Sequence, residues 1–154
     1  MKILLISGIP GTGKTSIGNY LEEQYSFRHL DMEKIIPSLG SSYWPFLRNA
    51  ISKAKKLNQE IAITWGFVPG EDDEKILKLK EIGVKMIWFD GNREAARKAF
   101  LDRGTVSEDL FNSQIDKIEN ADIISTFRPI VFNTFKDDSS FLTKNEIASK
   151  LLEL

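Results

Sequence analysis

The chain has 154 residues, of which 42% are hydrophobic and 28% are charged, and its formal net charge is −1. This length suits one domain of ordinary soluble composition, and the near-neutral charge lacks the basic field that binds nucleic acids or anionic membranes non-specifically. Cysteine is absent, which excludes disulfides and thiolate metal sites and agrees with a reducing, cytoplasmic setting. We therefore expect a single domain over residues 1–154, with neither nucleic acid nor membrane among its partners.

Short apolar segments alternate with amphipathic segments along the whole chain. The first segment is a continuous apolar run, as expected of a parallel strand that is covered on both faces. Strands are predicted at residues 3–7, 27–31, 60–65, 84–90 and 130–132. Helices are predicted at 14–25, from Ser42 to about 54, and at 72–82, 93–103, 107–120 and 143–152, with further caps at Asn92, Ser107 and the Thr143–Glu146 pair. This alternation predicts an α/β fold, a three-layer doubly wound parallel sheet of five strands.

The most specific motif lies directly after the first strand. Residues 8–15, Gly-Ile-Pro-Gly-Thr-Gly-Lys-Thr, fit Gly-x-x-x-x-Gly-Lys-[Ser/Thr], the phosphate-binding loop. The glycines let successive backbone N–H groups curl around phosphate oxygens, and the following helix presents its positive end to the same anion. Lys14 would reach the β- and γ-phosphates, and Thr15 would place its hydroxyl on a magnesium ion (Mg2+). The predicted ligand is ATP, held by Gly8, Pro10, Gly11, Thr12, Gly13, Lys14, Thr15 and Ser16.

The motif and the element order resemble the small P-loop kinases of the gluconate kinase and shikimate kinase type, relatives of the nucleoside monophosphate kinases. Residues 110–119, Leu-Phe-Asn-Ser-Gln-Ile-Asp-Lys-Ile-Glu, are similar to the Leu-x-x-Ser-Gln-Phe-x-x-Leu-Glu stretch that gluconate kinases carry behind a basic lid. The resemblance implies strand order 2-3-1-4-5, a short lid at about 103–110, and adenine contacts at Asn133, Thr134 and Phe135. It also implies transfer of the γ-phosphate of ATP to a hydroxyl of a small-molecule acceptor. Whether the chain is a monomer or a homodimer stays open.

The segment after the third strand departs from both families. It reads Thr-Trp-Gly-Phe-Val-Pro-Gly at 64–70, without the basic and aromatic segment of gluconate kinases and without the triple-glycine turn of shikimate kinases. The acceptor is therefore left open. The third strand also lacks a terminal aspartate of the Walker B kind. In shikimate kinases an acidic pair after the second strand helps to hold magnesium, and Asp31 and Glu33 resemble that pair.

Three charged side chains are the candidates for chemistry besides Lys14. Asp31, at the carboxyl end of the second strand, is the predicted proton acceptor and a metal-site residue with Thr15 and Glu33. The alternative is that the two acids merely begin the next helix, where acidic residues favour the positive end. Arg103 continues the helical spacing of 96, 99 and 100, so it is the predicted lid arginine, with Arg97 as the alternative.

Arg48, Trp65 and Phe67 are the predicted acceptor contacts, because they lie on segments that surround the second substrate in this fold. A nucleoside monophosphate kinase would need arginines on the acceptor phosphate, and between Glu33 and Lys53 the sequence offers Arg48 alone. A nucleotide-binding switch module without a small-molecule acceptor is the third interpretation, kept open by the missing Walker B aspartate. The sole histidine, His29, is expected to be structural.

Overall fold

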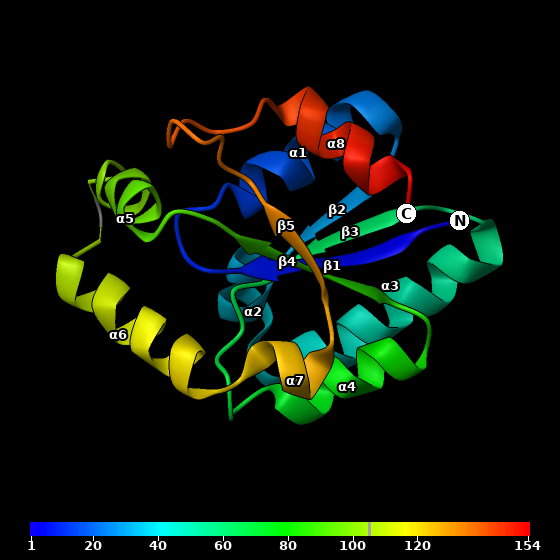
Figure 1. Cartoon of the computed structure of the whole chain (residues 1–154). Coiled ribbons are helices and arrows are strands. Elements are labelled where there is room, and N and C mark those ends of the chain that lie inside the picture. The colour runs from blue at the N-terminus through cyan, green and yellow to red at the C-terminus, as the bar shows by residue number, and fades with distance from the viewer. Residues whose placement is uncertain (105) are drawn as a thin grey trace.

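The computed structural model describes residues 1–104 and 106–154, and its centre is a parallel sheet of five strands (Figure 1). The strands are β1 (Ile3–Gly8), β2 (Arg28–Asp31), β3 (Ile61–Thr64), β4 (Lys85–Asp90) and β5 (Ile130–Asn133). Every neighbouring pair is parallel, and the order is β2-β3-β1-β4-β5. The predicted fold class and strand order are therefore confirmed.

Helices cover both faces of this sheet. The helices are α1 (Lys14–Tyr25), α2 (Met32–Leu39), α3 (Tyr43–Leu57), α4 (Asp73–Glu81), α5 (Arg93–Leu101), α6 (Glu108–Asn120), α7 (Ile123–Phe127) and α8 (Lys144–Leu152), with a 3-10 turn η1 (Gly40–Ser42). Figure 1 shows α1 and α8 on one face and α3, α4 and α7 on the other, while α5 and α6 lie beyond one end of the strands. None of the helices in the described part of the chain has the length and apolarity to cross a membrane.

The central strand β1 is buried along its whole length because both of its faces are covered. Leu4 and Ile6 pack into the core beneath α1 and α8, whereas Ile3 and Leu5 pack into the larger core on the opposite face. A strand of this kind needs apolar side chains at every position, which explains the continuous apolar run in the sequence.

The stretch between β2 and α3, which the sequence left without a pattern, is helical. Asp31 caps α2, since its carboxylate accepts a hydrogen bond from the backbone N–H of Glu33 at 3.1 Å. The 3-10 turn η1 then leads directly into α3. The prediction that Ser42 caps a helix is wrong, because its backbone is already helical and its side chain makes no capping bond.

Three other predicted caps are confirmed. Asn92 accepts from the N–H of Ala95, Ser107 from that of Leu110, and Thr143 from that of Glu146. Helix α5 nevertheless ends at Leu101 rather than at residue 103, and α7 was not predicted. Five residues are too few to show a helical period, and α7 lies between two left-handed residues, Asp122 and Arg128.

Candidate active site

The phosphate-binding loop is fixed between β1, β4 and α5. A Cβ at Gly8 would lie 2.1 Å from the backbone oxygen of Phe89, and one at Gly11 would lie 2.0 Å from that of Ala96. Both glycines also have positive φ, 145° and 78°. Glycine is therefore required at these two positions by close backbone approach as well as by conformation. The buried Thr12 hydroxyl donates to the backbone oxygen of Ile9 at 2.7 Å, which closes the loop on itself.

Lys14 folds back over this loop. Its Nζ donates to the backbone oxygens of Ile9 at 3.0 Å and of Gly8 at 3.4 Å. Burial lowers the pKa of Lys14 to about 8, while the charge of Glu33 raises it and that of Arg103 lowers it further. The ammonium group thus lies within the electrostatic reach of one acid and one arginine, in the loop where phosphates would bind.

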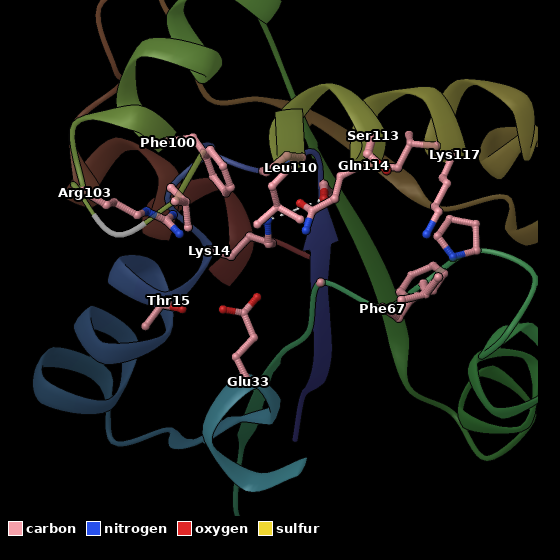
Figure 2. Close-up of a pocket in the computed structure, with 17 residues that line it drawn as sticks. Lys14, Thr15, Glu33, Phe67, Phe100, Arg103, Leu110, Ser113, Gln114 and Lys117 are labelled. Carbon is pink, nitrogen blue, oxygen red and sulfur yellow. Dashed lines mark hydrogen bonds between the residues drawn. The ribbon is translucent and has the colours of Figure 1, made fainter. Parts of the chain in front are cut away.

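A cavity of about 410 Å³ opens beside the loop (Figure 2). It is bounded by the loop and the start of α1, by α2, by the segment that follows β3, and by α5, α6 and the turn between them. The lining residues are Gly8, Pro10, Lys14, Thr15, Glu33, Gly66, Phe67, Val68, Pro69, Phe100, Arg103, Val106, Leu110, Ser113, Gln114, Lys117 and Ile118. The carboxyl ends of β1 and β3 lead into it, which is where ligands bind in open parallel sheets.

Glu33 is the carboxylate that faces this cavity. Its side chain extends from α2 toward Lys14 (Figure 2), and its Oε1 lies 3.0 Å from where a Cβ would stand on Gly66. Asp31 does end β2 as predicted, but its carboxylate caps α2 and is absent from the cavity lining. The alternative interpretation, that the two acids begin the next helix, is therefore confirmed. Glu33 in the first turn of α2 lines the cavity and Asp31 does not, whereas the catalytic and metal-binding roles of the two acids stay predictions.

Arg103 lies at the mouth of the cavity, in the turn after α5. Its guanidinium carbon lies 5.5 Å from the centre of the Phe100 ring, and within the described residues it forms no ion pair. Arg97 instead pairs with Glu94 and with Glu108, the latter at 3.0 Å, and does not line the cavity. Of the two arginines considered for the lid, Arg103 is thus the one available to a ligand. The predicted lid spans 103–110, and its residue 105 lies outside the described residues.

The three predicted acceptor contacts separate in the structure. Phe67 lines the cavity. Trp65 is a core residue instead, 3% exposed, with its ring edge-on to Tyr43 and Phe67. Arg48 is exposed on α3 and is not part of the lining. Trp65 and Phe67 are both buried, and no local sequence pattern indicates which of them also borders a cavity.

The loop after β5 lies next to the phosphate-binding loop. The backbone N–H of Thr134 donates to the backbone oxygen of Asp90 at 3.1 Å, and the side-chain oxygen of Asn133 accepts from the backbone N–H of Phe135 at 3.0 Å. The rings of Phe135 and Phe141 lie 4.4 Å apart, and a Cβ on Gly13 would lie 3.8 Å from Phe141. The predicted adenine contacts therefore have a rigid loop beneath them, and the contacts themselves stay a prediction.

The cavity is also lined by residues that were not predicted as site residues, although they lie in the 110–119 stretch that resembles gluconate kinases. Helix α6 contributes Leu110, Ser113, Gln114, Lys117 and Ile118. They follow the spacing i, i+3, i+4, i+7, i+8 of one helical face. This spacing indicates that the five residues share one face of the helix. The face mixes polar and apolar side chains, so the sequence does not mark it as a buried or a ligand-binding face.

The residues present fit a magnesium ion that is held jointly with phosphates. Within residues 1–104 and 106–154, no group of three or more His, Asp or Glu side chains could hold a metal by itself. The cavity does contain one carboxylate, from Glu33, and the hydroxyls of Thr15 and Ser113, of which that of Thr15 lies at the end of the phosphate-binding loop. Mg2+ keeps several waters and takes one or two protein ligands beside substrate phosphates, so this sparse oxygen set suits it.

Comparison with known proteins finds the same architecture in solved structures of kinases. No family model matches the chain. A shikimate kinase from Persephonella marina is 26% identical over 102 residues, which are 58% of this chain and 62% of the relative, so the match spans less than two thirds of that protein. A gluconokinase structure from Sinorhizobium meliloti 1021 has a TM-score of 0.61 at 15% identity, covering 99% of this chain and 96% of its own.

A shikimate kinase structure from Bacteroides thetaiotaomicron has a TM-score of 0.60 at 14% identity and covers 99% of both chains. These likenesses confirm the resemblance to P-loop small-molecule kinases of the shikimate and gluconate kinase type. At these identities the solved structures show the fold alone.

Proposed function

We propose that the chain is an ATP-dependent phosphotransferase that moves the γ-phosphate to a hydroxyl of a small molecule. The observation that carries this proposal is one cavity that joins the phosphate-binding loop to Lys14, Glu33 and Arg103. The likeness to shikimate kinase and gluconokinase supports the same class of reaction. The acceptor is not inferred from those names.

The phosphate half of the reaction needs positioning and positive charge. The backbone N–H groups of residues 11–15 bind the β- and γ-phosphates, and Lys14 leaves the carbonyls of Gly8 and Ile9 to pair with phosphate oxygens. Arg103 closes over the transferring group from the lid, where its planar guanidinium suits two oxygens at once. A bound Mg2+, held by Thr15 beside the phosphates, would neutralise part of their charge.

Glu33 acts on the acceptor hydroxyl. It accepts the hydroxyl proton as the oxygen forms its bond to the γ-phosphorus, while the bond from that phosphorus to the bridging oxygen of ADP breaks and ADP leaves. Asp31 contributes indirectly, because its cap on α2 fixes the helical turn that carries Glu33. The products are the phosphorylated acceptor and ADP, and the released proton is on Glu33.

The extent of the cavity favours an enzyme over a nucleotide-binding switch module. The lining continues past the phosphate-binding loop to Phe67 and Lys117, which gives room for a second ligand. A nucleoside monophosphate kinase would hold the acceptor phosphate with arginines, but Arg103 is the single arginine among the described lining residues and belongs to the lid.

The test is a coupled ADP-release assay with a panel of hydroxylated acceptors, together with calorimetry of Mg-ATP binding. Lys14→Ala should weaken nucleotide binding and turnover together, whereas Glu33→Gln should lower kcat by about 10²- to 10⁴-fold with nucleotide affinity almost unchanged. The matched control is Glu81→Gln, at the exposed end of α4. Full turnover by the Glu33 variant, or no heat with Mg-ATP, would contradict the proposal.

A further inference from the structure

Two apolar walls line the cavity beside its polar groups. Phe67, Val68 and Pro69 form one wall in the segment after β3, and Leu110 and Ile118 belong to the other, on α6. In Figure 2, Phe67 lies below α6, and Leu110 lies above Lys14, on the Lys14 side of Lys117. An acceptor that extends from Glu33 toward Lys117 therefore runs along both apolar walls.

The wall that follows β3 is rigid. The Phe67 ring is 6% exposed and makes edge-to-face contacts with Trp65, Trp88 and Phe127 at centroid distances of 6.2, 6.4 and 5.5 Å. The backbone N–H of Val68 donates to the Asp72 carboxylate at 3.0 Å, which fixes the start of the loop. Because both the ring and the loop are held, this wall keeps its apolar surface when a ligand enters.

The wall on α6 contains an apolar side chain that lacks cover. Leu110 is 43% exposed although it lines a cavity and lies on the face that α6 turns inward. A ligand with an apolar body would bury this side chain, at about 25 cal/mol for each Å² removed from water. Burial of the exposed Leu110 side chain would therefore contribute to the affinity for such an acceptor.

Few polar side chains remain for the acceptor's own hydroxyls. Beyond the loop and the lid, the described lining offers the polar side chains of Glu33, Ser113, Gln114 and Lys117. A linear sugar acid carries a hydroxyl on nearly every carbon, and each one buried without a partner costs about 1–3 kcal/mol. A polyhydroxylated acceptor would thus leave several groups unsatisfied against Phe67, Pro69 and Leu110.

Lys117 marks the far end of the same space. It lies one helical turn beyond Ser113 on α6, and it forms no ion pair with any residue that the structure describes. Figure 2 shows its side chain descending from α6 toward Phe67. An unpaired ammonium group at that place suits an anionic group on the acceptor.

We infer that the acceptor is an amphipathic hydroxy acid, with an apolar or aromatic body between the Phe67 and Leu110 walls and its acidic group at Lys117. This inference rests on the proposed function, since it describes the second substrate of the same site. It departs from polyhydroxylated acceptors, which the two walls do not suit.

The experiment is calorimetry on the full chain with Mg2+ and a non-hydrolysable ATP analogue, using three probes. The probes are 4-(hydroxymethyl)benzoate, its methyl ester and gluconate, which separate the aromatic body, the acidic group and the polyol; in the first probe the hydroxyl and the carboxylate lie at opposite ends of the ring. We expect 4-(hydroxymethyl)benzoate to bind at least about tenfold more tightly than gluconate, because its ring covers apolar wall. Leu110→Gln should weaken 4-(hydroxymethyl)benzoate and the ester alike, by about five- to tenfold.

The charge at position 117 has a separate readout. Lys117→Met should weaken 4-(hydroxymethyl)benzoate by about three- to fivefold and leave the ester unchanged, as expected of a partly exposed ion pair. The matched controls are Leu77→Gln, 41% exposed on α4, and Lys53→Met, exposed on α3; neither should alter any affinity.

Two kinds of failure are distinguishable. Equal or tighter binding of gluconate, no binding of 4-(hydroxymethyl)benzoate, or an unaffected Leu110 variant would overturn the amphipathic acceptor while leaving the phosphotransferase in place. Absence of heat from the ATP analogue itself would instead remove the proposed function, and the acceptor inference with it.

Discussion

Raising the pH should weaken nucleotide binding, because Lys14 titrates close to neutrality in the unliganded chain. Burial lowers the pKa of Lys14 from 10.5 to about 8, and Arg103 adds to this lowering while Glu33 opposes it. A bound polyphosphate places negative charge on the ammonium and raises that pKa again. Nucleotide binding is therefore coupled to uptake of a proton.

The size of this coupling follows from the pKa of about 8. Lys14 in the unliganded chain is protonated to about nine tenths at pH 7, one half at pH 8 and one tenth at pH 9. Since the nucleotide selects the protonated form, its Kd should rise about tenfold between pH 7 and pH 9. Proton uptake per bound nucleotide should be about 0.5 at pH 8.

Stability and affinity should change in opposite directions over this range. The pKa of Lys14 is lower in the folded chain than the value of 10.5 for the free side chain. Between about pH 8 and pH 10.5 the unfolded chain binds more protons, so the Lys14 contribution makes the unliganded protein more stable as the pH rises. The charged ammonium is thus a cost to the fold that the bound phosphates remove.

Calorimetry at pH 8 in two buffers of different ionisation enthalpy measures the uptake directly. The ligand is a non-hydrolysable ATP analogue with Mg2+. Lys14→Arg keeps the charge but does not titrate in this range, so its binding should show no uptake. If the unsubstituted chain bound the analogue with no proton uptake at pH 8, the assignment of Lys14 to the phosphates would be refuted.

Three further predictions concern residues around the site. Asp31→Ala should lower the free energy of unfolding by about 1 kcal/mol in chemical denaturation, because it removes the cap of α2, and should reduce kcat less than Glu33→Gln does. Gly18→Ala should lower the melting temperature, since its Cβ would lie 2.2 Å from His29 Nε2; His29→Ala in the same chain should restore it. Arg103→Lys should lower kcat by about tenfold or more in the ADP-release assay while nucleotide affinity changes little, because a point charge cannot bridge two oxygens.

The parts of the fold that could be predicted from sequence are those whose pattern is local. A buried parallel strand such as β1 shows a continuous apolar run, and a capped helix such as α5 shows Asn92 before its first turn. Helix α2 was not predicted, because its cap, Asp31, was interpreted mainly as an acid at a strand end and because Pro37 lies inside the helix. Asp31 could be a proton acceptor that faces a cavity or the cap of a helix. These two interpretations differ in where the side chain lies in the folded protein, which a local sequence pattern does not indicate.

The same limit applies to the site. The phosphate-binding loop was predictable because its chemistry needs fixed residue types at fixed spacing, and the glycines that it needs are at Gly8 and Gly11. The acceptor half has no such rule. Trp65 and Phe67 are two positions apart in sequence, both follow the end of β3 at Thr64 and both are buried, yet Phe67 lines the cavity and Trp65 does not.

The end of β3 explains why the acid of this site comes from α2. Thr64 occupies that position, buried, with its hydroxyl 2.7 Å from Nε2 of His29, whose Nδ1 lies 2.9 Å from the Asn19 side chain. Burial lowers the pKa of His29, against the opposing charges of Asp31 and Glu22, so the hydroxyl meets a neutral ring at physiological pH.

A neutral hydrogen-bonded pair at the end of β3 leaves Lys14 without a carboxylate from that strand. Glu33, brought beside Lys14 by the first turn of α2 and given room by Gly66, supplies the negative charge instead. An acid on a helix turn lies farther into the cavity than one at a buried strand end, where an acceptor can reach it. The absence of an acid at the end of β3 and the presence of Glu33 in the first turn of α2 therefore belong together, and this arrangement suits proton transfer from an acceptor.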